Sequence, residues 1–450
     1  MKTIYILFIT IALVSFTTRA QIVNIPDPAF KNALVNYPVV DTNGDGSADA
    51  DVDTNNDGEI QETEAEAVNN LSVGQLPITS LEGLSSFVNL EYFTMVQNFF
   101  TSIDVTTMSN LRELIIANNQ LTSLDITQNP NLEILNCSGN HLTSLDTSQN
   151  PNLEVLVCGV NDITQLDVSQ NLALIEFSCN SNELSTLDVT QNPALEYLNF
   201  ATNSIAAIDL SQNVNLRDLN CDSNQLSELD TSQNINLIKL YCRNNLLTDI
   251  NANQSVLLEF LHCDNNLLTV IEVSNISALK SLTCKDNMIT TIDISQNINV
   301  FGVNCRNNQL TSLNIDNGTN LPTVHTQENP NLLCIQVNDV AFANAQECNG
   351  STGWCKDETA VYSEDCSLGI VEQTLQAAIQ LYPNPVKNTL QISTENNLAI
   401  KSIAIFDVLG KKVLATKNTN PIDVSALASG LLFVKIETDK GNVIKKVVKE

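Results

Sequence analysis

The sequence has 450 residues, of which 43% are hydrophobic and 5% are aromatic. That length suffices for two or three domains with a large buried core. The formal net charge is −30, but residues 380–450 carry +4 and residues 1–20 carry +2, so residues 21–379 carry −36. Because phosphate contacts need a basic surface, this charge excludes a nucleic-acid-binding protein and favours cations such as Ca²⁺ as ligands. Three histidines in the whole chain argue against a haem protein or a His-rich metalloenzyme.

Residues 1–20 have the pattern of a secretory signal peptide. Lys2 precedes an apolar run from Ile4 to Phe16, and Ala20 ends a typical cleavage site. The run is shorter than the roughly 20 residues that a transmembrane helix needs, and no other segment is apolar enough to span a bilayer. The sequence therefore predicts export, without a transmembrane anchor, into a compartment that permits disulfides.

Residues 21–70 are expected to form an N-terminal cap. Asp27 followed by Pro28 is a helix start, in which the Asp side chain caps the first turn and Pro takes the first helical position. Phe30 and Leu34 lie four residues apart, on one face of the helix. Such a helix would cover the first coil of the repeats that follow.

Residues 53–64 fit the EF-hand calcium loop, D-x-[DN]-x-[DN]-G-x₅-E, at every required position. Calcium takes six to eight oxygen ligands. In this pattern they come from side chains, one backbone carbonyl, one water-mediated contact and a bidentate glutamate: Asp53, Asn55, Asp57, Glu59, Gln61 and Glu64. Gly58 permits the sharp turn, and Ile60 is expected to point into the core. The alternative is a solvated acidic loop without a bound ion.

The same pattern starts twelve residues earlier, but its last position is Val52. A second, weaker calcium site there depends on another carboxylate from Asp49, Asp51 or Asp53 in place of the missing glutamate. Its expected ligands are Asp41, Asn43, Asp45 and Asp49.

A repeat of 21 residues dominates residues 71–335. One unit reads Leu-x-x-Leu-x-Cys-x-x-Asn-x-Leu-x-x-Leu-Asp-x-Ser-Gln-Asn. The cysteines on this spacing are Cys137, Cys158, Cys179, Cys221, Cys242, Cys263, Cys284 and Cys305. The same repeat position, called the grid position below, holds Met95, Ile116, Phe200 and Thr326 in the other four coils. Each grid position is followed three residues later by an asparagine: Asn98, Asn119, Asn140, Asn161, Asn182, Asn203, Asn224, Asn245, Asn266, Asn287, Asn308 and Asn329. Each amide can bond backbone groups of adjacent coils, so the stacked asparagines form a ladder.

The repeat closely resembles a bacterial leucine-rich repeat of the short, 21-residue kind. The resemblance implies a right-handed solenoid of about twelve coils, each with a short strand such as Leu135 to Cys137 that buries alternate residues. A coil of 21 residues has no room for a long helix, so the opposite side is expected to be extended or turn-like. We therefore expect a mainly β protein with little helix.

The eight cysteines on the grid are expected to be buried free thiols. A metal array and a chain of disulfides are the alternatives. Phe200 and Ile116 occupy the same repeat position, which is therefore an apolar position. Neighbouring strands also lie about 4.8 Å apart, whereas the Cβ atoms of a relaxed disulfide lie about 3.8 Å apart.

Residues 336–366 depart from the 21-residue period and are expected to close the solenoid after a last strand at residues 333–337. Four off-grid cysteines suit disulfides in an exported chain, with three pairings open: Cys334, Cys348, Cys355 and Cys366. Secreted flavobacterial repeat proteins with a similar end segment have cysteines at the positions of Cys334 and Cys366. That resemblance implies a Cys334–Cys366 bond, with Cys348–Cys355 as the other.

Alternate strand residues are expected to face outward on the concave side of the solenoid, among them Asp222, Asp264 and His325. In so acidic a protein, grouped basic and aromatic side chains on this face are the best candidate binding patch. They are Lys239, Tyr241, Arg243, Phe260, His262, Lys285 and Arg306. An ordinary solvated sheet face is the alternative.

The sequence identifies no catalytic residue. His262 and His325 lie three coils apart, roughly 14 Å at strand spacing, which is too far for a shared metal. The sequence contains no HExxH, no GxSxG and no Gly-rich phosphate loop. We therefore expect a protein that is not an enzyme.

A linker at residues 367–379 is expected to lead to a small β-sandwich at residues 380–450. Strand-like runs span residues 380–384, 389–394, 399–406, 412–416, 431–437 and 443–448. Four motifs resemble the type IX secretion C-terminal sorting domain of Bacteroidota. They are Tyr382-Pro-Asn-Pro385, Phe406-Asp-Val-Leu-Gly410-Lys-Lys412, Ser429-Gly430-Leu431 followed by Phe433-Val-Lys435, and the basic end Lys445-Lys446 with Lys449. The resemblance implies recognition by the type IX machinery, export, removal of the tail, and release or surface attachment.

Together these features predict a secreted or cell-surface leucine-rich-repeat binding protein, calcium-stabilised and adhesin-like, with a protein or glycan partner. A surface-layer spacer without a specific ligand is the second hypothesis. A non-catalytic accessory of an extracellular enzyme is the third.

Overall fold

The computed structural model describes residues 21–252, 254–349, 353–366, 378–394, 398–417, 421–438 and 442–450. The expected signal peptide and residues 367–377 of the expected linker lie outside this part. The chain forms two compact units, Met1–Leu237 and Ile238–Glu450. Within the described ranges, none of the helices combines the length and the apolar character needed to cross a membrane.

The first unit begins with the predicted cap. Its two helices are α1 (Pro28–Asn36) and α2 (Glu62–Ala65). Asp27 caps α1, since its Oδ1 accepts hydrogen bonds from the backbone N–H groups of Ala29 and Phe30. Its Oδ2 accepts from the N–H and the hydroxyl of Thr79, so one carboxylate joins the cap helix to the first coil. Phe30 and Leu34 are fully buried, as predicted.

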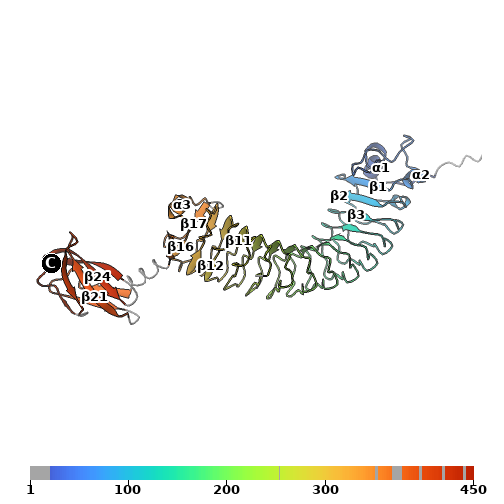
Figure 1. The fold of residues 1–450 in the computed structure, drawn as a ribbon. Helices are drawn as coiled ribbons and strands as arrows, with labels where there is room; N and C mark the ends of the chain where they lie inside the picture. The colour runs from blue at the N-terminus through green and yellow to red at the C-terminus, as the bar shows by residue number, and fades with distance from the viewer. Residues whose placement is uncertain are drawn as a thin grey trace, which may run out of the picture. The chain divides into compact units, whose positions relative to one another are not determined.

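The strands of the first unit are short and parallel, and each lies one coil after the last, as the labels β1, β2 and β3 in Figure 1 show. They are β1 (Asn70–Gly74), β2 (Tyr92–Val96), β3 (Glu113–Ile115), β4 (Ile134–Asn136), β5 (Val155–Val157), β6 (Glu176–Ser178), β7 (Tyr197–Asn199) and β8 (Asp218–Asn220), with a 3₁₀ turn η1 (Leu84–Ser86) before β2. In the three-residue strands β3 to β8 the middle residue faces the core: Leu114, Leu135 and Leu156 pair in register and are fully buried. The solenoid has about 13 coils, one more than expected, because β1 precedes β2 by 22 residues and so lies off the grid.

The second unit continues the pattern with two parallel sheets. The first contains β9 (Lys239–Tyr241), β10 (Phe260–His262), β11 (Ser281–Thr283), β13 (Gly302–Asn304), β15 (Thr323–His325) and β17 (Gly353–Cys355). The second contains β12 (Thr291–Asp293), β14 (Ser312–Asn314), β16 (Cys334–Gln336) and β18 (Val361–Ser363). In the first unit the corresponding residues, such as 123–125, form no strand and a turn follows them at residues 127–128. The prediction of an extended or turn-like side therefore holds in both units.

The strand predicted at residues 333–337 is present, but it is not the last strand of the solenoid. That segment contains β16, but β16 belongs to the second sheet, and α3 (Val340–Ala345), β17 and β18 follow it. β17 pairs with β15, thirty residues earlier, and so adds one more strand to the first sheet. The backbone of Gly353 makes this possible: its φ is 82°, and a Cβ atom there would lie 1.9 Å from the carbonyl oxygen of Glu347.

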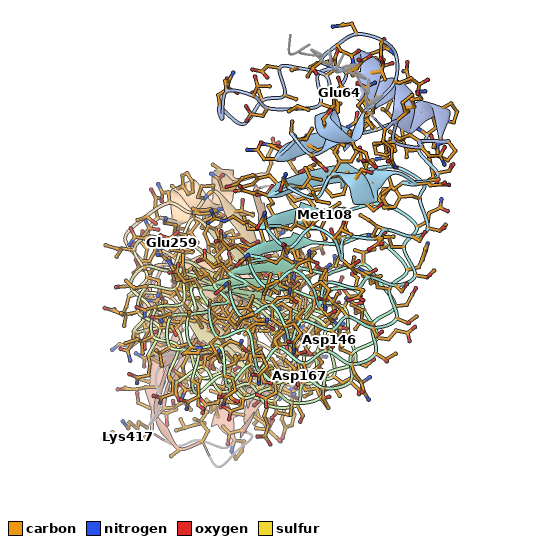
Figure 2. All side chains as sticks on the ribbon, turned by 90° about the vertical axis from the view of Figure 1, so that its right-hand side faces the viewer. Glu64, Met108, Asp146, Asp167, Glu259 and Lys417 are labelled. Carbon is orange, nitrogen blue, oxygen red and sulfur yellow. A yellow bond between two sulfur atoms is a disulfide. The ribbon has the colours of Figure 1, made fainter. Side chains whose placement is uncertain are left out.

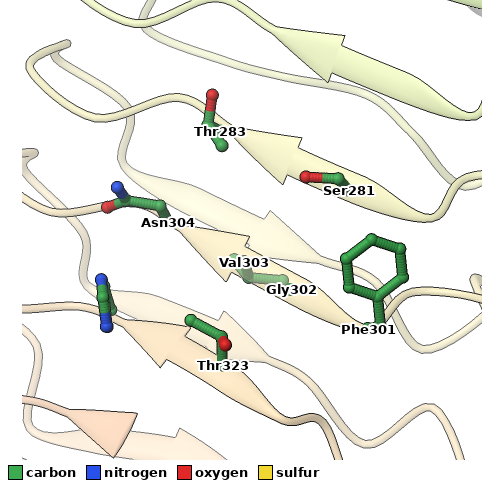
Figure 3. A pocket seen from close by; sticks show the side chains of 8 residues that line it. Ser281, Thr283, Phe301, Gly302, Val303, Asn304 and Thr323 are labelled. Atoms are coloured by element: carbon green, nitrogen blue, oxygen red, sulfur yellow. The ribbon is translucent and has the colours of Figure 1, made fainter. Parts of the chain in front are cut away.

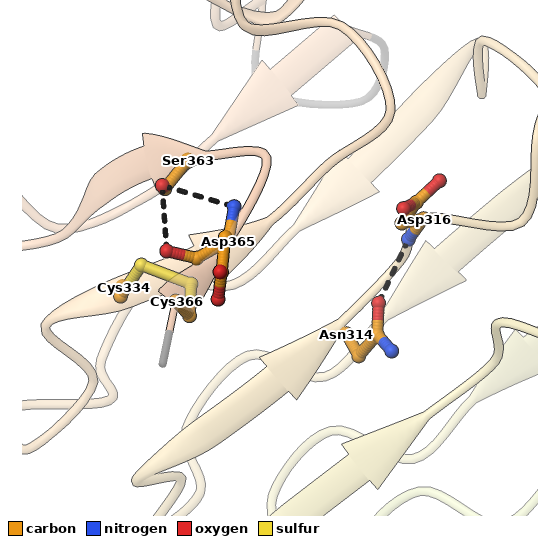
Figure 4. Close-up of a disulfide and its surroundings, with 6 residues drawn as sticks. All are labelled: Asn314, Asp316, Cys334, Ser363, Asp365 and Cys366. Carbon is orange, nitrogen blue, oxygen red and sulfur yellow. Dashed lines mark hydrogen bonds between the residues drawn. A yellow bond between two sulfur atoms is a disulfide. The ribbon is translucent and has the colours of Figure 1, made fainter. Parts of the chain in front are cut away.

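Both predicted disulfides are present in the C-terminal cap. Cys334 bonds to Cys366, and Cys348 bonds to Cys355. Figure 4 shows the first of them beside Ser363, whose hydroxyl donates to the carbonyl oxygen of Asp365 at 3.0 Å. The Cys334–Cys366 disulfide therefore connects β16 to the residues that follow β18.

The asparagine ladder joins each coil to its neighbours through buried amides. Asn140 donates from Nδ2 to the carbonyl oxygens of Cys137, in its own coil, and Ile116, in the coil before. Its Oδ1 accepts from the backbone N–H of Leu121 at 3.0 Å. One side chain thus satisfies three backbone groups that would otherwise be buried without partners.

The cysteine ladder lines the core, and all eight cysteines on the grid are free and buried. Burial raises the pKa of Cys137, Cys179 and Cys305 to about 12, because a thiolate is poorly stabilised away from water. Phe200 is equally buried in the same repeat position. The prediction of buried free thiols at this repeat position is confirmed.

An aspartate recurs in most coils in the Leu-Asp-x-Ser-Gln-Asn part of the repeat, before the second asparagine. Figure 2 labels two of these aspartates, Asp146 and Asp167, on the same side of the molecule. The backbone N–H of Ser148 donates to Asp146 at 2.9 Å, and this bond holds the pKa of Asp146 below its usual range. The turn that follows Asp146 therefore orders its side chain.

The C-terminal region of the second unit consists of two antiparallel sheets, β19-β20-β23 and β22-β21-β24-β25. Their strands are β19 (Ile379–Tyr382), β20 (Thr389–Thr394), β21 (Ile400–Phe406), β22 (Lys412–Thr416), β23 (Ile422–Asp423), β24 (Gly430–Thr438) and β25 (Asn442–Lys449). Side chains of both sheets, such as Leu390 and Ile403, share one core. All six expected strands are present, and among the described residues of this region only the two-residue β23 was not predicted.

The buried thiols predict a distinct pattern of alkylation. In the folded protein at pH 8 we expect none of the eight ladder cysteines to react, because the thiolate is the nucleophile and burial keeps these thiols neutral. After unfolding without reductant, mass spectrometry is expected to show eight alkylated cysteines, and twelve after reduction. Twelve unreactive cysteines in the unfolded, unreduced chain would contradict this account.

The residue before each ladder asparagine has a positive φ, and Val160 (φ 57°) is a β-branched residue in that conformation. Such a residue is strained there, whereas asparagine, which Asn118 (φ 58°) represents in another coil, is tolerated. Val160 is 55% exposed, so Val160→Asn removes no core contact. We expect it to stabilise the fold by about 1 kcal/mol and raise the melting temperature. The reverse change, Asn118→Val, is expected to lower the melting temperature. If both variants melt at the same temperature as the parent protein, Val160 is not strained.

Candidate functional site

The loop at residues 53–64 is folded by its own polar side chains. Asp53 accepts hydrogen bonds from the backbone N–H groups of Asp57 and Gly58, and Asn55 Oδ1 accepts from Asp57 at 2.8 Å. Glu64 reaches back across the loop, where its Oε1 accepts from the Thr54 hydroxyl at 2.8 Å. Gly58 has the expected positive φ of 85°, and Ile60 is buried.

The donor chemistry of this loop fits calcium, since its ligands are carboxylate, amide and carbonyl oxygens. Within the part of the chain that the structure describes, no three His, Cys, Asp or Glu side chains are grouped closely enough to hold a metal ion. A calcium ion would therefore need Asn55, Gln61 and the Glu59 carbonyl to complete its ligands. Glu59 also accepts a hydrogen bond from Lys31 of α1 at 2.5 Å, which connects the loop to the cap helix.

The upstream loop has the same internal geometry and a different closing residue. Asp41 accepts from the backbone N–H groups of Gly44 and Gly46, and the bond from Gly46 holds the pKa of Asp41 below its usual range. Asp49 accepts from the Thr42 backbone and hydroxyl and from the Asn43 amide. Asp49 thus contacts the second and third loop positions, as Glu64 does in the other loop. Of the three carboxylates considered as substitutes, Asp49 is the one in this position.

The predicted concave patch is an aromatic cluster with a cation against it. β9 and β10 pair so that Tyr241 lies opposite His262, with ring centroids 4.9 Å apart. Phe260 meets the same imidazole edge-on at 6.4 Å. The Arg243 guanidinium lies 5.8 Å from the Tyr241 ring centroid, within cation–π distance. Lys239 is on β9, two residues before Tyr241.

The remaining basic residues of the patch lie beside carboxylates. Lys285 is 3.7 Å from Asp286, and Arg306 pairs with Glu328. Asp264 lies between two coils: burial raises its pKa, and it accepts a hydrogen bond from the backbone N–H of Lys285 at 3.0 Å. The patch therefore presents aromatic surface with locally balanced charge rather than a basic field.

Three side chains expected to face outward are buried in the structure, namely Asp222, Asp264 and His325. Asp264 turns onto the next coil, where it also accepts from the Thr283 hydroxyl at 3.1 Å. His325 lies on β15 opposite Cys355 of β17, a strand that was not predicted. The expectation of an exposed His325 was therefore wrong.

Beside the patch lies an apolar ridge that the sequence analysis missed. Leu246, Leu267 and Met288 follow the ladder asparagine in three successive coils and are 51%, 42% and 37% exposed. In most other coils this position holds a polar residue, such as Gln225 or Gln309, although Phe99 occupies it in one coil of the first unit. A comparison of each coil with its neighbours would have revealed the ridge.

The fold and motifs together define a leucine-rich-repeat solenoid with a C-terminal sorting domain. The Secretion system C-terminal sorting domain model matches residues 380–450, and this match indicates a secreted, cell-surface protein. A model described as Leucine Rich repeats (2 copies) matches residues 109–150 and 130–173. No curated protein sequence matches the chain.

Solved structures of bacterial repeat proteins have the same fold. The functional domain of InlJ from Listeria monocytogenes, which includes a cysteine ladder, is 24% identical with a TM-score of 0.61, covering 96% of this chain and 98% of that one. A leucine-rich-repeat protein of Leptospira interrogans is 23% identical (TM-score 0.55; 61% and 79% covered). The internalin InlF of Listeria monocytogenes is 20% identical (TM-score 0.52; 66% and 94% covered). At these identities the likeness concerns the fold.

Proposed function

We propose that the chain is an adhesin-like extracellular protein that binds a protein or glycan partner through the concave patch of its second unit. The observation that carries this proposal is the cluster of Tyr241, Phe260 and His262 with Arg243 beside it. Aromatic and arginine side chains supply most hot spots of binding interfaces. A fold that needs only to stack its coils has no use for such residues at strand positions that face outward.

The apolar ridge supports the same location. Leu246 follows Arg243 by three residues, and Met288 follows Lys285 by three, so ridge and patch occupy the same coils. Exposed apolar side chains in contiguous coils are a common mark of an interaction surface. A partner that covered both would bury aromatic, aliphatic and charged groups together, as protein interfaces do.

Charge reversal within the patch tests this proposal. We expect Arg243→Glu with Lys285→Glu to weaken binding of a concave-face partner by about 1–3 kcal/mol, the range of ordinary hot-spot losses. Partners are identified by glycan array and pull-down with residues 21–450, and affinities by surface plasmon resonance. Arg112→Glu with Arg217→Glu, exposed residues of the first unit, makes the same change in net charge and serves as control. A partner that binds both double variants as well as the parent protein uses another surface.

We further propose that the cap loops bind Ca²⁺, with Asp53, Asn55, Asp57, Glu59, Gln61 and Glu64 as the main site. The support is the complete ligand pattern and the loop geometry, in which Glu64 contacts the second and third loop positions, Thr54 and Asn55. The ion would stabilise the cap by neutralising adjacent carboxylates in a strongly acidic unit. Asp41, Asn43, Asp45 and Asp49 form the weaker second site.

Calorimetry of variants tests the calcium proposal. Glu64→Gln keeps the side-chain volume but removes the charge of the bidentate ligand, so we expect calcium affinity to fall at least tenfold. Glu62→Gln, in the first turn of α2, is the matched control and is expected to bind normally. A chelator is expected to lower the melting temperature of the parent protein, because an ion that binds only the folded state stabilises it. Unchanged calcium affinity in Glu64→Gln would refute the site.

We also propose that residues 380–450 serve as an export address rather than as part of the working protein. Their strands share a core of their own, and the solenoid carries separate caps at both ends. We expect a chain truncated after residue 379 to keep its melting temperature when purified but to stay in the periplasm of the native host. A truncated chain that still reaches the surface, measured by surface proteolysis, would contradict this role.

A further inference from the structure

A hollow of about 400 Å³ opens on the concave side of the second unit, next to the patch. It exists because the first residue of β13 is a glycine. Gly302 pairs with Ser281 on one side and Thr323 on the other, so three small residues lie side by side on adjacent strands. At the same strand position β9 and β10 carry Lys239 and Phe260.

The walls of the hollow differ in character. Figure 3 shows Phe301 and Asn304 on opposite sides of Gly302. Phe301 is 49% exposed, so part of its ring is available to a ligand. Thr283 and Asn304, at the other strand ends, contribute a hydroxyl and an amide.

The polar groups around the hollow are neutral and retain capacity for hydrogen bonds. The Thr283 hydroxyl donates to Asp264 and can still accept, and Asn304 Oδ1 accepts from the Arg306 backbone at 3.3 Å. Among the described residues, the Asn304 NH₂ group has no protein partner. Apart from the buried His325, no residue that lines the hollow is ionisable.

We propose that this hollow binds one pyranose residue of a neutral saccharide. A charged ligand would lose its hydration there without an opposite charge to replace it. A purely apolar ligand would leave the hydroxyl and amide groups without their water partners. A pyranose has an apolar ring face for Phe301 and hydroxyls for Ser281, Asn304 and Thr323. The inference deepens the proposed function, on which it rests, by naming a ligand class for the concave face.

The hollow also adjoins the aromatic cluster. The Ser281 hydroxyl lies 3.5 Å from Nε2 of His262, and Phe260 pairs with Ser281 across β10 and β11. A saccharide that extends beyond one residue along the strands therefore meets a second aromatic surface.

Gly302→Val provides a direct test. A Cβ atom at Gly302 meets only the Cβ of Thr323 at 3.9 Å, an ordinary contact, and valine suits a strand. The variant fills the hollow while the fold is kept, which its circular dichroism and melting temperature check. Glu176→Val makes a change to valine at the same strand position of β6, away from the hollow, and is the control. Phe301→Ala removes the aromatic side chain at one side of the hollow. It tests the same inference if Gly302→Val does not fold.

The probes are methyl glycosides of glucose, galactose, mannose, fucose and N-acetylglucosamine, with methyl glucuronide as an anionic counterpart. Binding to residues 21–450 is measured by saturation-transfer NMR and titration. We expect at least one neutral glycoside to bind, at least tenfold weaker binding in Gly302→Val and Phe301→Ala, and unchanged binding in Glu176→Val. Absence of binding by every neutral glycoside, binding that survives Gly302→Val, or equal binding of the glucuronide overturns the inference.

The outcomes separate this inference from the proposed function. If a partner responds to Arg243→Glu with Lys285→Glu while no neutral glycoside binds, the inference fails and the proposed function stands. If glycosides bind the hollow while the charge-reversed variant keeps all its partners, the proposed binding role of the patch is rejected and saccharide binding by the hollow is retained.

Discussion

The solenoid depends on hydrogen bonds that buried asparagines make between successive coils. Asn140 bonds backbone groups of three residues in two coils, because its side-chain amide combines two N–H donors with a carbonyl acceptor. Its loss would leave buried backbone groups without partners, at roughly 1–3 kcal/mol each. The same three bonds recur 21 residues later at Asn161, and so on along the repeat. The period holds the strands in register, and the register brings Tyr241 opposite His262 and Gly302 between Ser281 and Thr323.

The two ends of the solenoid are closed by different chemistry. At the first, Asp27 holds helix α1 and the first coil with one carboxylate. At the second, Trp354 covers the final coil, and its indole N–H donates to the carbonyl oxygen of Leu321 at 2.7 Å. Both ends bury apolar surface that a stacked repeat would otherwise expose. The disulfide cap also depends on redox conditions, because reduction would break the Cys334–Cys366 and Cys348–Cys355 bonds that hold it.

Features that recur in every coil could be predicted from the sequence, whereas features that occur once could not. Spacing alone located the asparagines, the core cysteines and the strands, because each coil supplies the same evidence again. β17 has no such signal: it lies thirty residues after β15, and the pairing depends on the close backbone approach at Gly353. The hollow escaped notice because a missing side chain at Gly302 matters only once its neighbours on adjacent strands are known. The weaker acidic loop was recognised, but the role of Asp49 needed the observed contacts.

The cysteine ladder has a consequence for what happens after the fold is lost. Inside the core the thiols are neutral and shielded from oxidants, even though the chain is exported. An unfolded chain would expose eight reactive thiols at once in an oxidising environment, where they pair at random through exchange. Oxidised in this way, the chain could no longer restore its coils. Heat denaturation is then irreversible, and the lifetime of the protein outside the cell is governed by its rate of unfolding rather than by its equilibrium stability.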